Sequence, residues 1–505
     1  MRITLLLLFL AAFSCNTSEP LTPERPNILF LFADDLTFSA IHALGNQEIK
    51  TPNIDRLANT GTTFTHAYNM GGWHGAICMA SRAMLISGQK LWPAQSVSQQ
   101  WSNGDSAVLK RSWGRIMAQH DYNTYMSGKW HVSAPADYVF DQAKHVRPGM
   151  PGDKWGELRE NLNGRKLTEL ITPDLDLQEV MPPGYHRPNN PDDDSWSPSD
   201  TSFGGYWAGG KHWSEVLKDD GLEFIADASQ SEKPFFMYLA FNAPHDPRQA
   251  PQEFLDMYSL NDIGVPPNYL PVYPWKDSIG NSPGLRDEAL APFPRTEFAV
   301  KTHIKEYYAI ISHLDQQIGE ILDALKASGK MDNTYIFFSA DHGLAVGQHG
   351  LIGKQSMFDH SMRVPLIVTG PGIPAGKKIN HDVYLQDIMP TALELAKIEK
   401  PDYVFFNSFL DQANGKSQKG NYAAIYGAYR NLQRMIRKDG YKLIVYPKIN
   451  KVLLFDMEDD PWEKQDLAEL PEHQDRVRHL FEELVELQKE MEDELDLSAV
   501  YGELF

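Results

Sequence analysis

Cys78 is the residue of this chain whose chemistry most needs an explanation. The sequence contains two cysteines, and the other, Cys15, lies in the apolar N-terminal segment, so Cys78 has no disulfide partner in the mature protein. Arg82 follows one turn later in a predicted helix that begins near Cys78, where the helix dipole favours an anion. This spacing favours a reactive group that faces an anionic ligand, and a buried structural cysteine is the alternative.

Two pairs of polar residues directly follow apolar runs that are typical of buried strands. Asp34 and Asp35 follow one run, and Asp341 and His342 follow another. Adjacent carboxylates repel each other unless a cation lies beside them, and a hard divalent ion such as calcium or magnesium suits oxygen ligands. Two such strand ends on one sheet edge indicate a shared metal site. A polar exit from a strand remains the simpler interpretation of either pair alone.

Four further basic residues stand at positions that suit a ligand site. Lys129 and His131 occur in Gly-Lys-Trp-His after a predicted strand at 123–126, and His245 lies between two prolines after another strand. Lys354 ends a glycine-spaced loop that permits close approach to a ligand. Taken singly, each position is also consistent with a solvated lysine or a packed histidine.

The elements that must position these residues predict an α/β fold. Apolar runs typical of a parallel sheet cover 27–33, 235–241, 335–340 and 365–368, and helical patterns cover 106–120, 302–329 and 383–398. This alternation indicates a large central, mostly parallel sheet flanked by helices. Two loop-rich insertions, 132–222 and 258–296, are expected at the carboxyl ends of the strands, where ligands bind.

The C-terminal part of the chain has a different pattern. Short alternating strands surround the turn signal Asp439-Gly440, and a charged amphipathic helix covers 471–494. We expect a smaller α+β subdomain with a short antiparallel sheet at 416–505, after a catalytic domain at 25–415.

The N-terminus resembles a bacterial export signal. Residues 1–15 contain one basic residue and an apolar stretch too short to span a bilayer, and Ala12-Phe13-Ser14-Cys15 resembles a lipobox. We expect Cys15 to carry a lipid and residues 16–24 to form a tether, which places the protein in the periplasm or at the cell surface, anchored to the outer membrane. An ordinary cleavable signal is the alternative. The net charge of −20 argues against a general nucleic-acid binder.

Taken in order, six segments resemble the motifs of the sulfatase family of the alkaline-phosphatase superfamily. They are Pro26–Asp35, Thr51–Leu57, Cys78–Gly88, Gly128–His131, Ala243–Pro247 and Ser339–Lys354. The resemblance extends over about residues 25–400, and the Cys-x-Pro/Ala-x-Arg motif followed by glycine is highly specific. It implies an alkaline-phosphatase-like fold and a sulfuric ester hydrolase that acts on sulfated carbohydrates.

The resemblance also implies that Cys78 is oxidised to Cα-formylglycine before export. One hydroxyl of the hydrated aldehyde then attacks sulfur to form a sulfo-enzyme intermediate, and the other expels sulfate. Asp34, Asp35, Asp341 and His342 resemble the ligands of one calcium ion, which also contacts the modified Cys78. Asp341 is in addition a suitable acceptor for the proton of the nucleophile.

The remaining roles are also those that the resemblance implies. Arg82 and Lys129 would hold the diol and the sulfate, and His131 would assist regeneration of the aldehyde. His245 and Lys354 would flank the leaving oxygen, with His245 preferred as the general acid.

Two positions depart from the commonest family pattern. Ala80 stands where proline is commoner, which points toward the radical-based bacterial maturation enzyme rather than the oxygen-dependent one. His342 stands where several members have asparagine, which leaves the metal site intact.

The substrate is the least determined part of the prediction. We expect an algal polysaccharide or its oligosaccharides, such as ulvan or a sulfated galactan or fucan; glycosaminoglycans are a further candidate class. Aromatic and basic residues of the loops are candidate sugar contacts: Trp73, His74, His186, Arg187, Trp207, His212, Trp213, Arg248 and Arg430. Two alternatives stay open, a phosphonate monoester or phosphodiester hydrolase and a non-catalytic lipoprotein that binds sulfated glycans.

Overall fold

A nine-stranded sheet forms the centre of the structure, a computed structural model that describes residues 25–152, 155, 158, 160 and 180–502. The strand order is β10-β2-β8-β7-β1-β6-β4-β5, and β9 pairs with β2. The strands are β1 (Asn27–Ala33), β2 (Thr62–Tyr68), β4 (Asn123–Lys129), β5 (Gln142–Arg147), β6 (Phe235–Ala240), β7 (Thr334–Ala340), β8 (Arg363–Thr369), β9 (Lys377–Ile379) and β10 (Val383–Tyr384). The large, mostly parallel sheet expected from the sequence is confirmed.

One strand departs from the expected parallel arrangement. β8, which contains the apolar run 365–368, runs antiparallel to both β2 and β7. The run itself carries no sign of direction, because a strand buried on both faces is continuously apolar whichever way it points. The sequence therefore predicts this strand but not its orientation.

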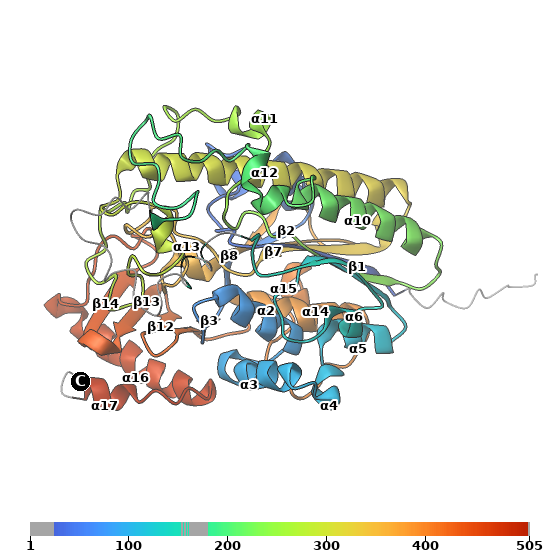
Figure 1. The fold of residues 1–505 in the computed structure, drawn as a ribbon. Helices are drawn as coiled ribbons and strands as arrows, with labels where there is room; N and C mark the ends of the chain where they lie inside the picture. The colour runs from blue at the N-terminus through green and yellow to red at the C-terminus, as the bar shows by residue number, and fades with distance from the viewer. Residues whose placement is uncertain (1–24, 153–154, 156–157, 159, 161–179, 503–505) are drawn as a thin grey trace, which may run out of the picture.

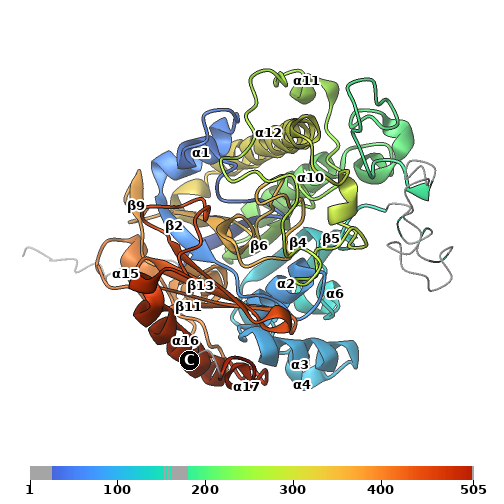
Figure 2. The ribbon, with the colours of Figure 1, turned by 90° about the vertical axis from the view of Figure 1, so that its left-hand side faces the viewer.

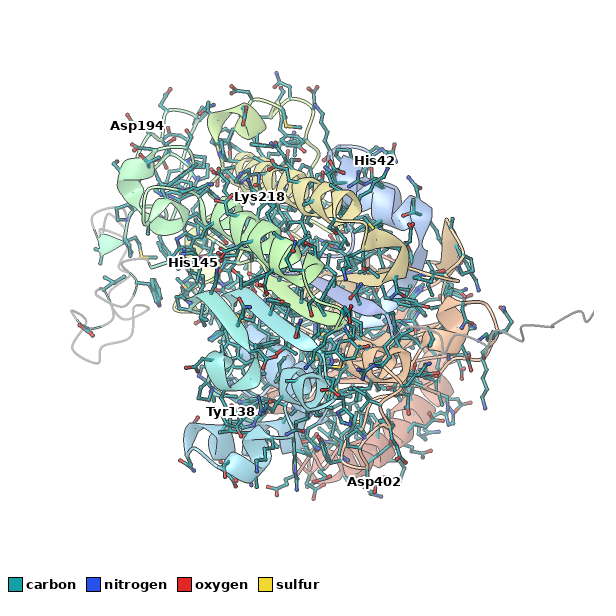
Figure 3. The ribbon with its side chains drawn as sticks, turned by 90° about the vertical axis from the view of Figure 1, so that its right-hand side faces the viewer. His42, Tyr138, His145, Asp194, Lys218 and Asp402 are labelled. Atoms are coloured by element: carbon teal, nitrogen blue, oxygen red, sulfur yellow. The ribbon has the colours of Figure 1, made fainter. Side chains whose placement is uncertain are left out.

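Helices cover both faces of the sheet, as Figure 1 shows. The long helices α10 and α12 lie together on one face, and α2, α5 and α14 lie on the other (Figures 1 and 3). Lys218 of α10 forms an ion pair with Glu320 of α12 at 3.0 Å, whereas His145 marks the edge strand β5 (Figure 3). All seven residues of β1 are buried between these layers, which explains the apolar run at 27–33.

The helices broadly follow the predicted pattern, with two differences. They are α1 (Pro52–Thr60), α2 (Ile77–Ser87), α3 (Leu91–Ser102), α4 (Ser106–Leu109), α5 (Trp113–Gln119), α6 (Ala136–Val139), α10 (Trp213–Ser229), α11 (Gln252–Leu255), α12 (Glu297–Ala327), α13 (Asp359–Met362), α14 (Ile388–Leu395), α15 (Leu410–Ala413), α16 (Gln474–Glu490) and α17 (Leu497–Tyr501). The pattern at 106–120 divides into α4 and α5, and the segment 383–398 begins with the strand β10.

A smaller sheet lies beside the large one near the C-terminus. Its order is β14-β13-β12-β11-β3, and β11 to β14 pair in antiparallel fashion. The strands are β3 (Gly71–Gly72), β11 (Ile425–Tyr429), β12 (Gln433–Lys438), β13 (Tyr441–Tyr446) and β14 (Lys451–Asp456), and α16 packs against them (Figure 2). Because β3 immediately precedes α2, the smaller sheet draws a strand from the N-terminal half of the chain.

A buried group of charged residues joins the smaller sheet to the larger part of the molecule. We call Asp359, Arg363, Lys442 and Glu463 the junction cluster. The Lys442 amine of β13 donates to the Asp359 carboxylate of α13 and, at 2.7 Å, to Glu463. The Asp359 N–H donates to Glu463 at 2.7 Å, and Arg363 lies 3.4 Å from Asp359. These contacts pair each charge with a neighbour inside the protein.

Candidate active site

The polar residues at the predicted strand ends gather at the carboxyl edge of the large sheet. Asp34 follows β1, Lys129 ends β4 and Asp341 follows β7. β1 pairs in parallel with β7, with Ala33 opposite Ala340, so Asp34 and Asp341 leave the sheet side by side. This pairing explains why two residues separated by some 300 positions share one site.

The end of β4 requires a glycine beside Lys129. Gly128 has φ +92°, and a Cβ there would lie 2.0 Å from the carbonyl oxygen of Ala240 in β6. Lys129 follows with a fully buried side chain whose amine forms an ion pair with the Asp34 carboxylate. A buried cation thus stands beside the first of the adjacent carboxylates.

A group of ligand atoms converges between these strand ends. Asp34, Cys78, Asp341 and His342 each offer one atom, and these four atoms lie within 4.8 Å of one another. Together with Asp35 they form what we call the catalytic cluster. Asp34, Asp35 and His342 show 0% exposure, and Cys78 shows 2%.

Two atoms of this cluster are buried without a hydrogen-bond partner. They are Asp34 Oδ1 and His342 Nε2. His342 Nε2 lies 3.2 Å from Asp35 Oδ1 without the alignment of a hydrogen bond. Burying such groups unpaired is costly, so their convergence fits a cation that binds both. Carboxylate oxygens and an imidazole nitrogen are suitable ligands for a divalent metal ion.

The pKa values of the three carboxylates of the cluster are shifted in different directions. Burial and the neighbouring Asp341 carboxylate raise the pKa of Asp34 well above its ordinary value. Burial also raises the pKa of Asp35, although the Lys354 amine opposes this effect. Burial would likewise raise the pKa of Asp341, but His342 and Arg82 outweigh it and hold that pKa well below normal. A bound cation would relieve the repulsion between these carboxylates.

Cys78 lies in the first turn of α2 and points toward this cluster. Its sulfur is 3.2 Å from His131 Nδ1. Burial by itself would raise the pKa of the thiol, but Lys129, His131 and Lys354 outweigh it and hold that pKa well below the ordinary value. The surroundings therefore stabilise negative charge at position 78, as a site for an anionic group requires.

Arg82, one turn along α2, is fixed in place from several sides. Its Nε donates to Asp341 Oδ2 at 2.9 Å and its Nη1 donates to the Lys129 carbonyl at 2.9 Å. The guanidinium carbon lies 4.7 Å from the ring centre of Phe32. Nη2 is buried without a hydrogen-bond partner and lies 4.0 Å from Asp34 Oδ1. The two N–H groups of Nη2 on a rigid guanidinium therefore remain for a ligand.

His245 and Lys354 stand at the other side of Asp35. The Lys354 amine donates to the Asp35 carboxylate at 2.8 and 3.0 Å, and His245 Nε2 lies 3.8 Å from Asp35 Oδ2. Burial and the Lys354 ammonium lower the pKa of His245 well below normal. Burial opposes the charge of Lys354, but Asp35 and Asp287 outweigh it and raise the pKa of Lys354 well above normal.

These protonation states bear on the choice of proton donor. The Nδ1 of His245 lies 2.7 Å from the Asp246 carbonyl, which accepts a hydrogen bond only if that nitrogen carries the proton. In a neutral ring Nε2 then has no proton to give. Because the pKa of Lys354 is raised, we propose Lys354 as the proton donor in place of His245, the donor expected from the sequence.

Sequence reasoning missed several charged residues beside the leaving-group side. Arg286 forms an ion pair with Asp246 and lies 3.0 Å from Asp287, whose other oxygen accepts from the Gln355 amide at 2.7 Å. Asp287 also raises the pKa of Lys354. Nothing in the sequence of the insertion 258–296 marks Arg286 or Asp287. The sequence predicted only that this insertion lies at the carboxyl ends of the strands, where ligands bind.

The predicted sugar contacts separate into two groups. Trp73, His74 and Arg430 lie together near the mouth of the site, since the Arg430 N–H donates to the Gly72 carbonyl at 2.9 Å. Gly75, next to His74, accepts from the Gln355 amide at 3.0 Å. His74 and Arg430 are exposed and Trp73 is partly buried, so these three remain available to a ligand.

The structure places His212 and Arg248 in the interior, and their contact with a sugar stays a prediction. His212 is fully buried, with Nε2 3.0 Å from the Gln249 carbonyl and Nδ1 accepting from the Ser214 N–H that begins α10. Arg248 is 3% exposed, and its Nη1 lies 2.8 Å from His303 Nδ1. Both side chains serve the packing around α10 and α12, and an isolated basic residue in a loop sequence does not reveal this.

The other candidate contacts are also mostly internal. Arg187 is buried and forms a bidentate ion pair with Glu306 of α12. Trp213 is 8% exposed at the start of α10, and Trp207 is partly buried beside it. Cys15, the predicted lipid-bearing residue, lies outside the described residues.

Comparison with protein families identifies two matching models. The model described as Sulfatase matches residues 26–398, which is more than half of the chain. The model described as N-sulphoglucosamine sulphohydrolase, C-terminal, matches residues 347–490. The Sulfatase match includes every residue of the catalytic cluster.

Curated relatives match over most of their length. A sulfatase of Formosa agariphila is 28% identical over 463 residues, which cover 87% of this chain and 83% of the relative. An arylsulfatase of Clostridium perfringens is 27% identical, and the match covers 93% of this chain and 95% of the relative. An ulvan-active sulfatase of Formosa agariphila is 25% identical, with 95% of this chain and 84% of the relative covered.

Solved structures share the fold. A protein in complex with its substrate D-glucosamine-2-N,6-O-disulfate has a TM-score of 0.67 and 21% identity, and the match covers 93% of this chain and 99% of that one. The phosphonate monoester hydrolase of Agrobacterium radiobacter also has a TM-score of 0.67, with 20% identity and coverage of 92% and 96%. At these identities the likeness establishes the architecture alone.

Proposed function

Because the chain belongs to the sulfatase family, we propose that it removes sulfate from a sulfated carbohydrate such as ulvan or a sulfated galactan or fucan. The observation that carries the proposal is the position of Cys78. It lies between two buried cations and a histidine and beside three carboxylates with room for a cation. The names of an ulvan-active relative and of a solved neighbour with a sulfated glucosamine support a carbohydrate substrate.

We propose calcium as the ion of the catalytic cluster. Asp34, Asp35, Asp341 and His342 would hold it, because oxygen ligands dominate the set and two of its ligand atoms are otherwise orphaned. When bound, the ion offsets the charge of the sulfuryl group and lowers the pKa of a neighbouring hydroxyl. Removal of the ion is expected to abolish activity, and its return is expected to restore it.

We further propose that Cys78 is converted to Cα-formylglycine by a maturation enzyme of the radical type, as Ala80 suggests. The hydrated aldehyde supplies a nucleophilic hydroxyl and a second hydroxyl whose deprotonation releases sulfate. His131, 3.2 Å from the sulfur in the unmodified chain, is placed to take that second proton. An unmodified thiol at this position has no second hydroxyl, so that the reaction would stop after transfer of the sulfuryl group to the enzyme.

The remaining side chains position the ester and supply charge. Lys129 and the free N–H groups of Arg82 face the region where negative charge develops on the sulfuryl oxygens. Lys354, protonated beside Asp35 and Asp287, would donate a proton to the leaving oxygen, and neutral His245 would orient that oxygen. Asp341 accepts the proton of the attacking hydroxyl.

The location of the protein is part of the proposal. We propose export and attachment to the outer membrane through a lipid on Cys15, which becomes the first residue of the mature protein after residues 1–14 are removed. Among the described residues, no helix has the length and apolar character needed to cross a bilayer. Metabolic labelling with a clickable fatty acid should label the wild-type chain and leave a Cys15→Ala variant unlabelled.

The decisive test measures sulfate release from defined sulfated oligosaccharides of ulvan, carrageenan and fucan. Protein made with the maturation enzyme should carry a mass change at Cys78 and turn over many times. Cys78→Ser, where the host does not convert serine, should lose multiple turnover, whereas Met79→Ala should retain it. An unmodified serine variant with near-wild-type turnover would contradict the formylglycine mechanism.

Phosphonate monoester hydrolysis is the second candidate, because enzymes with that activity share this architecture. Matched aryl sulfate and phenyl phosphonate esters, assayed with one preparation of known modification state, discriminate the two activities. A larger kcat/KM for the phosphonate would overturn the sulfatase assignment.

A non-catalytic lipoprotein that binds sulfated glycans is the remaining alternative. It would be favoured if protein from the native host carries an unmodified Cys78 and still binds the glycan.

A further inference from the structure

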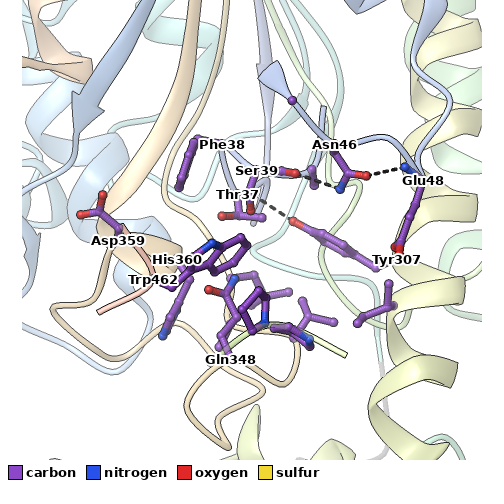
Figure 4. Close-up of a pocket in the computed structure, with 18 of the residues that line it drawn as sticks. Thr37, Phe38, Ser39, Asn46, Glu48, Tyr307, Gln348, Asp359, His360 and Trp462 are labelled. Atoms are coloured by element: carbon purple, nitrogen blue, oxygen red, sulfur yellow. Dashed lines mark hydrogen bonds between the residues drawn. The ribbon is translucent and has the colours of Figure 1, made fainter. Parts of the chain in front are cut away.

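A second cavity lies beside the catalytic cluster and has no part in the proposed reaction. Its volume is about 500 Å³, in the range of small-ligand sites (Figure 4). Its walls are formed by the loop after β1, segment 264–267, the N-terminal half of α12, the loop after β7, residues 359–363 and segment 461–463. Segments far apart in the sequence thus converge on one cavity.

Two polar atoms in the lining are buried without a hydrogen-bond partner. They are Thr37 Oγ1 and His360 Nε2, on residues that are 4% and 2% exposed. Other polar groups in the lining are already satisfied; the Asn46 amide, for example, donates to the Ser39 carbonyl at 2.9 Å and to the Tyr308 hydroxyl at 3.0 Å. Thr37 and His360 are thus lining residues that each keep one buried polar atom without a hydrogen-bond partner.

Aromatic side chains form much of the remaining wall. Phe38, Tyr307 and Tyr308 line the cavity, and Trp462 stands at its rim with 37% exposure (Figure 4). Aromatic faces with a few fixed hydrogen-bonding groups suit a molecule that has apolar C–H faces and hydroxyl edges. A pyranose ring has this character.

The charges around the cavity disfavour an anionic ring. Glu48, Asp359 and Glu463 contribute three carboxylates. Lys442 is paired with Asp359 and Glu463 and is not free to bind an anion. The lining contributes one cation, the guanidinium of Arg363. That guanidinium is already used, because it lies 3.4 Å from Asp359 and stacks 3.7 Å from the ring centre of Phe38. Burial and the nearby His349 also lower the pKa of His360 well below normal, which leaves its imidazole neutral.

We propose that this cavity is a second carbohydrate-binding site, which takes uncharged sugar units of the glycan whose sulfated unit enters the catalytic site. The proposal rests on the carbohydrate substrate proposed above. The two sites share a structural element, since the Tyr307 hydroxyl accepts from the Thr37 N–H at 3.0 Å and donates to the Asp35 carbonyl (Figure 4). Binding of the glycan at the cavity thus holds the polymer next to the catalytic cluster.

Saturation-transfer NMR on the full chain tests the proposal, with β-1,4-galactobiose as the neutral probe and galactose 6-sulfate as the anionic one. With the catalytic site saturated by inorganic sulfate, we expect transfer to the galactobiose and at least threefold less to the sulfated sugar. Trp462→Ala should reduce transfer to galactobiose at least fivefold, and Thr37→Val at least twofold. Phe203→Ala is the matched control, because Phe203 is also 37% exposed and lies outside the cavity. It should leave transfer within twofold of wild type.

Saturating inorganic sulfate, which competes for the catalytic site, should leave the galactobiose signal unchanged. Absence of transfer to galactobiose, equal transfer in the Trp462→Ala variant, or loss of the signal on addition of sulfate would each overturn the second site. Transfer to phenol but not to the disaccharide would also overturn it. Aryl sulfate hydrolysis, measured on the same preparations, reports separately on the proposed activity, so that either proposal can fail alone.

Discussion

The catalytic cluster and the junction cluster are both buried and charged, but they differ in how their charges are paired. In the junction cluster Lys442 bonds to two carboxylates, and Arg363 supports one of them. In the catalytic cluster Asp34 Oδ1 and His342 Nε2 have no hydrogen-bond partner. In the junction cluster every charged group has a partner within the chain, whereas in the catalytic cluster two ligand atoms have no hydrogen-bond partner.

This difference separates a role in stability from a role in binding. A buried ion pair contributes little net stability, but removal of one partner leaves an uncompensated charge and destabilises strongly. A cluster with buried ligand atoms that lack a hydrogen-bond partner already carries a cost in the free protein, and this cost is relieved when a cation binds those atoms. The two clusters should therefore respond in opposite ways to the same kind of substitution.

The largest effect is expected for Asp34→Asn. Loss of this ligand should lower kcat/KM for an aryl sulfate by about 10³- to 10⁴-fold, because the charge that stabilises the transition state is lost. The free energy of unfolding should fall by only about 1–2 kcal/mol, because an amide oxygen can still accept from Lys129, and burial and Asp341 already disfavour the Asp34 charge. Urea denaturation measures the second quantity, and a large destabilisation would show that Asp34 is a structural residue.

The converse effect is expected for Lys442→Met. The substitution keeps the volume of the side chain but leaves Asp359 and Glu463 buried without their shared cation. The free energy of unfolding should fall by about 3–5 kcal/mol, while kcat per folded molecule stays within about twofold of wild type. A variant as stable as wild type would show that the junction cluster does not hold the two sheets together.

A smaller effect is expected from calcium on the unfolding equilibrium. A ligand that binds only the folded state at 100 times its Kd stabilises by about 2.7 kcal/mol. Protein stripped with EGTA should gain stability of this order when calcium is added, and so should Lys442→Met. Asp34→Asn should gain much less. Equal stabilisation of the two variants would place the ion outside the catalytic cluster.

The sequence was sufficient for the residues that stand at strand ends. Asp34, Asp35, Asp341 and His342 each follow a strand whose continuous apolar pattern is local, and parallel pairing brings such ends to one edge. Cys78 and Arg82 were likewise predictable from spacing within a single helix. These predictions succeed because the information lies within a few residues.

Residues whose roles depend on partners far along the chain were not predictable. Arg286 and Asp287 lie in a loop without periodicity, and only folding brings them to His245 and Lys354. His212 was expected at a sugar but caps α10 through Nδ1, and its Nε2 lies beside the carbonyl of Gln249, which is 37 residues away. The strand pattern around Lys442 likewise does not show that this lysine is buried. Contacts of this kind are set by tertiary packing rather than by local propensity.

The smallest predicted effect concerns the pH dependence of the junction cluster. Burial raises the pKa of Glu463 from 4.5 to about 7, in spite of the Lys442 amine. The folded protein therefore holds this proton more tightly than the unfolded chain does. The resulting stabilisation is fully present below pH 4.5 and is lost as the pH rises through 7.

Glu463→Gln provides a neutral replacement that cannot titrate. The wild-type free energy of unfolding should fall by about 2 kcal/mol more than that of the variant between pH 4.5 and 7.5. Glu469→Gln is the control, because Glu469 is exposed and its pKa is lowered, so that it titrates below this window. Urea denaturation at several pH values gives the comparison. Parallel profiles for wild type and Glu463→Gln would mean that Glu463 is ionised throughout, and that the charges of the junction cluster are balanced at every pH in the range.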